Sequence, residues 1–126
     1  MTSRATNQDY SLIDKNEHKK DLLPLFKEKK HIVLTSRVHP GESNSSYMME
    51  GFIEFITSNN PIAVELRKRI VFHIIPCINP DGVIAGNYRV CMSGNDLNRR
   101  YTEPHPQLHP IVCAIKKLIK TISLKS

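Results

Sequence analysis

The stretch His31-Ile-Val-Leu-Thr-Ser-Arg-Val-His-Pro-Gly-Glu42 decides the fold of this chain. Its first part, His31–Val38, is rich in apolar and β-branched side chains, which predicts a buried β-strand. Pro40-Gly41 then marks a sharp turn at the end of that strand. The small polar residues after the turn are typical of a helix start, so the stretch indicates a strand–turn–helix unit.

Two helices are predicted after the turn. Ser43 or Asn44 can cap the first helix, which carries an apolar side and runs to about Thr57. Asn60-Pro61 places a capping residue before a proline at the first helical position, so a second, shorter helix is predicted through about Arg69.

A second strand is predicted over Ile70–Cys77, which is apolar and rich in β-branched residues. Strand, helices and strand in this order indicate a parallel sheet covered by helices. Apolar residues at helical spacing from Leu108 to Ile119 predict a final amphipathic helix. The expected fold class is therefore α/β, with a partial mixed or parallel sheet flanked by helices. Two parallel strands would leave apolar edges unpaired, so we expect an incomplete part of a larger domain.

Composition limits the classes of protein to consider. The chain has 126 residues, 40% of them apolar, which suits one globular domain. No apolar run is long enough to span a bilayer, and the N-terminus does not resemble a signal peptide, so no membrane association is expected. Cys77, Cys91 and Cys113 are widely spaced and odd in number, which predicts free thiols in a reducing compartment.

The net charge of +6 has two interpretations that stay open: a solvated surface, or affinity for an acidic partner. The basic residues concentrate in Lys15–Lys30 and in the terminal helix. Neither run is interleaved with aromatic residues, so a nucleic-acid partner is not expected. Residues 1–30 are predicted to be a polar lead-in, and residues 31–126 the folded unit.

His39 and Glu42 are the first candidate site. A strand end would fix the histidine, and the Pro-Gly turn would bring the glutamate three residues later toward the same point. Two histidines and one glutamate around an open fourth position form a common catalytic zinc site. A solvated turn with an unrelated histidine and glutamate is the alternative interpretation. His73, inside a strand, is expected to pack, and His105 and His109 to shape a turn.

A second motif follows the second strand: Asn79-Pro-Asp-Gly-Val-Ile-Ala-Gly-Asn-Tyr-Arg-Val-Cys-Met-Ser-Gly-Asn-Asp-Leu-Asn-Arg-Arg100. We expect it to form an ordered loop. Together with Ser36–Asn44, it resembles the zinc metallocarboxypeptidase family, specifically the branch of the cytosolic carboxypeptidases, from about His31 to Lys120. The resemblance implies that residues 31–126 are the N-terminal half of a zinc carboxypeptidase catalytic domain. Residues 1–30 would then be a remnant of an upstream module.

The family's site residues transfer by matching motifs. The resemblance implies that His39 and Glu42 are zinc ligands and that Arg89 stabilises the oxyanion of the tetrahedral intermediate. Asp96 would orient a ligand histidine through its other ring nitrogen, unless it only caps a turn.

Asn98 and Arg99 match the pair that grips the terminal carboxylate of the substrate. The implied reaction is hydrolytic release of a C-terminal residue, with glutamate from acidic protein C-terminal tails such as that of tubulin as the expected substrate. The implied location is the cytoplasm, associated with the cytoskeleton or cilium.

The resemblance also implies a third zinc-ligand histidine and a general-base glutamate in a later segment, and no such sequence follows Lys120. We therefore expect these 126 residues to be inactive alone, as a fragment or truncated form. The alternative function is a non-catalytic homologue that binds carboxylate tails through Arg89, Asn98 and Arg99.

Overall fold

A computed structural model describes residues 29–124 of the chain. The predicted lead-in over residues 1–30 therefore lies almost entirely outside the described residues. The elements follow in the order β1 (Lys30–Thr35), α2 (Asn44–Thr57), α3 (Pro61–Arg69), β2 (Ile70–Ile75), α4 (Pro80–Ile84), the 3₁₀ turn η1 (Leu97–Arg99) and α5 (Pro110–Ser123).

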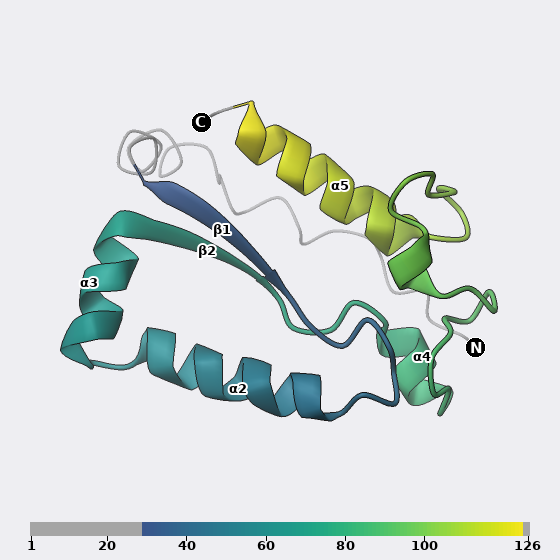
Figure 1. Cartoon of the computed structure of the whole chain (residues 1–126), viewed down its shortest axis with the longest axis horizontal. Coiled ribbons are helices and arrows are strands. Elements are labelled where there is room, and N and C mark those ends of the chain that lie inside the picture. The colour runs from purple at the N-terminus through teal and green to yellow at the C-terminus, as the bar shows by residue number, and fades with distance from the viewer. Residues whose placement is uncertain (1–28, 125–126) are drawn as a thin grey trace, which may run out of the picture.

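The two strands form a parallel sheet, which confirms the α/β prediction. Lys30 lies opposite Ile70 and Thr35 opposite Ile75, with no break in register. Figure 1 shows α2 and α3 along one face of this sheet and α5 along the other. The order strand, two helices, strand gives the chain its crossover, as parallel strands require.

Side chains alternate between the two faces of the sheet. Phe72 of β2 packs edge-to-face against Phe52 of α2, with ring centroids 5.7 Å apart. His31 and His73 share the other face, where Nδ1 of His31 lies 2.9 Å from Nε2 of His73 and the rings stack. His73 therefore pairs with a neighbouring strand, in agreement with its expected packing role.

Both strands end earlier than the sequence predicted. The expected strands reached Val38 and Cys77, whereas β1 ends at Thr35 and β2 at Ile75. Pro76 has no N–H to donate, and Arg37 adopts a positive φ of 52°, which no strand residue has.

The two segments nevertheless stay joined by backbone hydrogen bonds beyond the strand ends. Ser36 N–H donates to Ile75 O (3.0 Å), and Ile78 N–H donates to Ser36 O (2.9 Å). The segment that leads into His39 is therefore fixed to the segment that leads into Asn79.

The helices α2 and α3 begin at the predicted residues, but only α3 has the predicted side-chain capping hydrogen bond. Asn60 accepts a hydrogen bond from the Ile62 N–H (2.9 Å), as expected for a cap before Pro61. Ser43 precedes α2 as expected, but its side chain makes no capping hydrogen bond. Its φ and ψ of −62° and −26° are already helical, whereas a capping residue usually has extended backbone.

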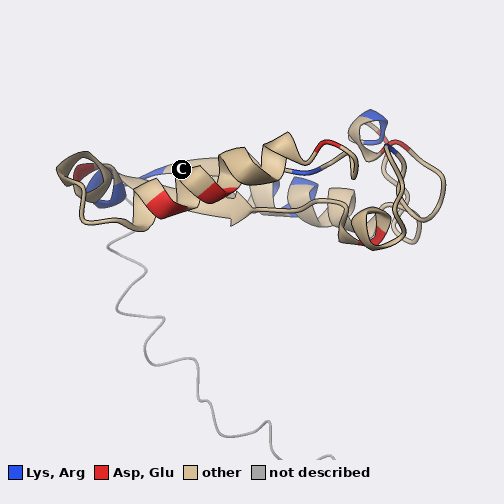
Figure 2. Ribbon diagram, turned by 90° about the horizontal axis from the view of Figure 1, so that it is seen from below, with Lys and Arg blue, Asp and Glu red and all other residues tan. Residues whose placement is uncertain are grey.

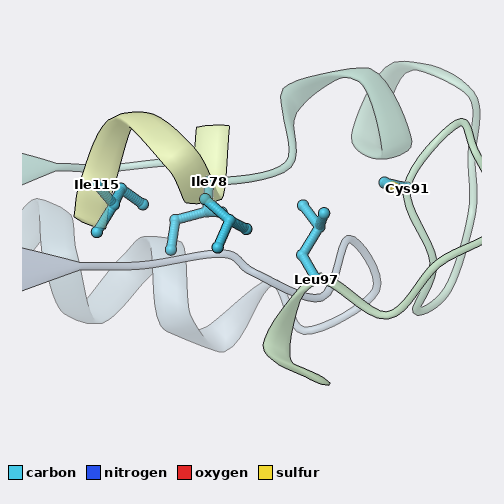
Figure 3. Close-up of a cluster of buried hydrophobic side chains, with 5 residues drawn as sticks. Ile78, Cys91, Leu97 and Ile115 are labelled. Carbon is cyan, nitrogen blue, oxygen red and sulfur yellow. The ribbon is translucent and has the colours of Figure 1, made fainter. Parts of the chain in front are cut away.

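The buried core lies between the end of the sheet, the 79–100 segment and α5. It consists of Ile78, Cys91, Leu97, Val112 and Ile115. Figure 3 shows Ile78, Cys91, Leu97 and Ile115 on different segments of the chain. Val112 is fully buried, and Leu97 is 2% exposed. Because the core is small, each of its members contributes a large share of the stability.

The loop before α5 is held by two histidines, as expected for a turn-forming role. The His105 N–H donates to Nδ1 of His109 (2.9 Å), and the His109 N–H donates to His105 O (2.8 Å). His109 is buried, and its Nε2 has no hydrogen-bond partner within residues 29–124. An Nδ1 that accepts a hydrogen bond carries no proton, so His109 is a neutral imidazole protonated at Nε2.

We expect the free energy of unfolding to fall as the pH drops below about 6.5. Burial lowers the pKa of His73, with a further contribution from His31. Burial also lowers the pKa of His109, and Arg100 and His105 add to the effect. The unfolded chain therefore binds protons at a pH at which the folded histidines stay neutral, so acid favours unfolding.

Denaturant titrations at about pH 7.5 and about pH 5.5 measure this loss of stability. His109→Asn keeps a side-chain acceptor for the His105 N–H but does not titrate, so it should lose less stability over this interval. A parent chain with equal stability at both pH values would contradict the prediction.

Charged residues and cysteines are distributed as follows in the described part of the chain. Glu50 and Glu54 are the charged residues of α2, whereas α5 carries three lysines (Figure 2). On the same face as α2, the helix α3 carries Glu65 together with Arg67, Lys68 and Arg69. Cys77, Cys91 and Cys113 are free thiols. None of the described helices combines the length and the apolar character needed to cross a bilayer.

Candidate metal centre

His39 and Glu42 face each other across the turn that follows β1. The His39 side chain is buried, and its Nδ1 lies 3.0 Å from Oε1 of Glu42, whose side chain is 45% exposed. The turn is closed by a hydrogen bond from the Glu42 N–H to His39 O (3.2 Å). The sequence pattern therefore places both side chains at one point, at the edge of the molecule that solvent reaches.

Asp96 holds the other side of the same imidazole. Its Oδ1 lies 3.1 Å from Nε2 of His39 and also accepts the Asn98 N–H (2.9 Å). Its Oδ2 accepts a hydrogen bond from Nε of Arg89 (2.9 Å) and lies 2.8 Å from Nη2 of the same guanidinium, as an ion pair. Burial raises the pKa of Asp96, but the hydrogen bonds from His39, the Asn98 N–H and Arg89 outweigh this and lower the pKa. Asp96 thus both caps η1 and contacts His39.

This arrangement fits a divalent cation between His39 and Glu42. If Nε2 of His39 donates its proton to Asp96, Nδ1 presents a lone pair toward the Glu42 carboxylate. The two atoms lie 3.0 Å apart, close enough to bind one ion, and imidazole nitrogen and carboxylate oxygen are both zinc ligands. Within residues 29–124, no third histidine, cysteine or carboxylate joins them to form a metal-binding group.

The segment around Tyr88 and the helix α4 both pack against the turn between His39 and Glu42. The Gly41 N–H donates to Tyr88 O (2.7 Å), and the Tyr88 ring lies directly over Gly41. A Cβ at Gly82 of α4 would come within 2.6 Å of the Pro40 side chain, so α4 also packs closely on the turn. The sequence alone did not indicate the contact with Tyr88. A glycine at position 41 does allow another segment to approach the backbone closely, but it does not say which segment.

The comparison with known proteins identifies the family of this chain. A sequence profile described as zinc carboxypeptidase matches residues 13–117. The chain belongs to the zinc carboxypeptidase family. Cytosolic carboxypeptidase 1 of Homo sapiens is 46% identical to it over 98 residues, and cytosolic carboxypeptidase 6 of Mus musculus is 51% identical over 92 residues.

The match covers only part of each zinc carboxypeptidase. The aligned region is 78% of this chain and 8% of human cytosolic carboxypeptidase 1, and 73% of this chain and 17% of the mouse protein. The crystal structure of a metallo-carboxypeptidase from Burkholderia cenocepacia aligns with a TM-score of 0.72 at 35% identity. That alignment covers 75% of this chain and 26% of the bacterial one, so the described fold corresponds to part of a carboxypeptidase domain.

The remaining candidate residues of this zinc carboxypeptidase chain lie in or next to the Asp96 turn. The Arg89 guanidinium is bound to Asp96, so Arg89 joins the His39–Glu42–Asp96 cluster. Asn98 and Arg99 form part of η1 with exposed side chains, and the buried Leu97 between Asp96 and Asn98 anchors this turn in the core. No described contact joins the Asn98 or Arg99 side chain to His39 or Glu42.

We expect Gly41→Ala to distort the turn between His39 and Glu42 and, if these residues bind zinc, to weaken that binding. An added Cβ would lie 2.3 Å from Cδ2 of Tyr88 and 2.9 Å from Tyr88 O. The exposed ring can rotate away, but the carbonyl is held by the Gly41 N–H, so the backbone itself must move. Overpacking of this kind costs about 1–3 kcal/mol, measurable as a lower denaturation midpoint.

Gly51→Ala is the matched control for that prediction. Gly51 lies within α2, and an added Cβ there meets no atom within 4 Å. Since alanine is the better helix former, this variant should be as stable as the parent or more stable. Equal denaturation midpoints and equal zinc affinities for Gly41→Ala and Gly51→Ala would refute the prediction.

Proposed function

We propose that this chain contributes part of the catalytic site of a zinc-dependent carboxypeptidase of the cytosolic branch. His39 and Glu42 would hold the zinc ion, and Asp96 would keep the imidazole oriented with Nδ1 toward it. When bound, zinc polarises the scissile carbonyl and lowers the pKa of a coordinated water. The observation that carries the proposal is the His39 imidazole, which contacts Asp96 through Nε2 and Glu42 through Nδ1.

Arg89 would stabilise negative charge during hydrolysis. Nε and Nη2 of the Arg89 guanidinium contact Asp96, and the Arg89 side chain remains 45% exposed. The group is therefore held in position while still presenting donors to a bound substrate. A preoriented cation beside a developing oxyanion is among the largest sources of rate enhancement.

Asn98 and Arg99 would bind the terminal carboxylate of the substrate. Both side chains are exposed, and the η1 turn that carries them is fixed by Asp96 at one end and Leu97 in the core. A guanidinium binds a carboxylate through two parallel hydrogen bonds, which selects a free chain end over an internal peptide bond.

The proposed substrate class is the acidic C-terminal tail of a protein, with release of glutamate and with tubulin as the type of substrate. The net charge of +6 and the cluster of Arg89, Arg99 and Arg100 favour an acidic chain. The names of the cytosolic relatives support a cytoplasmic location. Association with the cytoskeleton or cilium follows from the proposed tubulin-type substrate. Two ligands hold zinc loosely, so we propose that the 126 residues alone do not turn over substrate and that activity needs further ligands and a general base.

A chimera tests this function directly. Residues 31–120 of this chain would replace the matching segment of mouse cytosolic carboxypeptidase 6, which is 51% identical over 92 residues. We expect the chimera to release glutamate from a glutamate-tailed peptide, and the same chimera with Arg99→Met to lose release through a higher KM. The Arg69→Met chimera, altered in a surface ion pair of α3, is the control. A folded, zinc-loaded chimera without activity would contradict the proposal.

A second function is favoured by the exposure of the cationic residues. Arg89, Asn98 and Arg99 would bind carboxylate tails without hydrolysis, as a non-catalytic homologue. In that case the chimera would be inactive, yet the 126-residue chain would bind a glutamate-tailed peptide and not its C-terminal amide. The chimera assay separates the two functions, because only the first predicts release of glutamate. Titration of both peptides against the chain tests the carboxylate binding that the two functions share.

A further inference from the structure

Arg37 has an unusual backbone conformation two residues before the first metal-ligand candidate. Its φ of 52° is the only positive value for a non-glycine residue within residues 29–124. An L-residue with a side chain disfavours this region, and asparagine and aspartate tolerate it better than arginine does. Other contacts must therefore hold Arg37 in place, and the structure shows what they are.

The side chain and backbone of Arg37 bind the turn between His39 and Glu42 and the start of α2. Its Nε donates to Pro40 O at 2.8 Å, inside the turn between His39 and Glu42. Its Nη1 donates to Oγ of Ser46 at 2.7 Å, in the first turn of α2. Its own N–H donates to Oγ of Ser45 at 3.2 Å. One residue thus joins the end of β1, the turn and the start of α2.

Ser45 completes the connection on the glutamate side. Its Oγ donates to Glu42 O at 2.7 Å while accepting the Arg37 N–H. Its backbone carbonyl accepts the Ser36 hydroxyl at 2.7 Å. The carbonyls of Pro40 and Glu42 are therefore each tied to a fixed group, and the residues between them cannot shift independently.

We propose that Arg37 is a positioning residue that sets the distance between His39 and Glu42 for the metal ion. Arg37 does not contact either candidate ligand side chain, so it acts through the Pro40 carbonyl and the Ser45 and Ser46 hydroxyls. The metal part of this inference rests on the proposed function. The positioning part concerns the turn itself and holds with or without metal.

Arginine suits this task because it donates in two directions from one planar group. Nε points into the turn and Nη1 toward α2, a separation that the single ammonium group of lysine cannot span. Arg37→Lys therefore keeps the charge but loses one of the two contacts. Arg37→Asn loses both contacts but tolerates the positive φ, so it separates the guanidinium from the backbone conformation.

The experiment measures amide hydrogen exchange and cobalt binding in the 126-residue chain. In both variants we expect the Glu42 amide, which donates to His39 O, to exchange at least about 10-fold faster. The Ser36 amide, which donates to Ile75 O just beyond the end of β1, should stay unchanged. The dissociation constant for Co²⁺, read from its visible absorption, should rise about 10-fold, the lower bound for outer contacts of a metal site. Arg69→Met is the matched control and should change neither value.

The two readouts separate two kinds of failure. Unchanged Glu42 exchange in both Arg37 variants would overturn the positioning role, whatever the metal result. Accelerated exchange at Ser36 as well as Glu42 in Arg37→Asn and Arg37→Lys would also overturn it, because Arg37 would then be a general stability residue. No cobalt binding by the parent chain, together with faster Glu42 exchange in the variants, would refute the metal site and leave the positioning role intact.

Discussion

Leu97→Ala should lower the free energy of unfolding by about 2–5 kcal/mol. Leu97 is 2% exposed and packs in the core with Ile78, Val112 and Ile115. Removing its side chain leaves a cavity between η1 and α5, and so small a core has few neighbours that can move in to fill it. Since a whole domain is stable by about 5–15 kcal/mol, this single change removes a large part of the total.

Chemical denaturation followed by circular dichroism measures this loss, with Leu124→Ala as the matched control. Leu124 is 78% exposed, so its truncation should change stability by less than about 0.5 kcal/mol. A loss of less than about 1 kcal/mol in Leu97→Ala would mean that Leu97 is not part of a close-packed core.

His39→Ala should lower the zinc content of the chain well below that of the parent. Replacing a residue that only orients a ligand already costs about 10–100-fold in affinity, so removing a ligand from a two-ligand site should cost more than that. His39 is also the residue that joins the Glu42 side of the site to the Asp96 side, so no neighbouring group can substitute for it. The measurement is zinc content by mass spectrometry after equilibration with buffered zinc.

His105→Ala is the control for zinc content. His105 is exposed and its Nδ1 accepts only the Gln107 N–H in the described part of the chain, away from the turn. Zinc content should fall in His39→Ala and remain at the parent value in His105→Ala. Equal zinc in the parent and in His39→Ala would rule out His39 as a ligand.

The main elements of the fold were predictable because their signals are local. The β-branched runs at 31–35 and 70–75 and the Asn60-Pro61 helix start carry their own conformational preferences. The strand ends were not predictable, since the positive φ of Arg37 depends on hydrogen bonds to Pro40, Ser45 and Ser46 that form only in the folded chain.

The 79–100 segment was expected to be an ordered loop, but it contains α4 and η1. The signal for α4 was present, because Asn79-Pro80 repeats the cap-and-proline pattern of Asn60-Pro61, and Asn79 accepts the Gly82 N–H at 3.0 Å. The glycine two residues after the proline made a turn the more obvious interpretation.

The candidate site was only partly predictable from the residues themselves. The spacing of His39 and Glu42 is local, so their approach could be foreseen. Asp96 contacts the imidazole from 57 residues away in sequence, and Arg89 binds Asp96; only the family resemblance indicated that both belong to the site. The hydrogen bonds from Arg37 to the turn between His39 and Glu42 could not be predicted from the sequence, because an isolated arginine is usually a surface residue.

In the described part of the chain the two-stranded sheet has two open edges, so we expect the chain to self-associate at high protein concentration. Within residues 29–124 each strand has one partner, so the outer edge of each carries backbone donors and acceptors that another extended segment can use. Strands such as Ile70–Ile75 are apolar and β-branched, which favours pairing between copies at high concentration. Exchange, metal-binding and denaturation experiments should therefore be run as dilution series, so that effects of self-association are separated from those of each substitution.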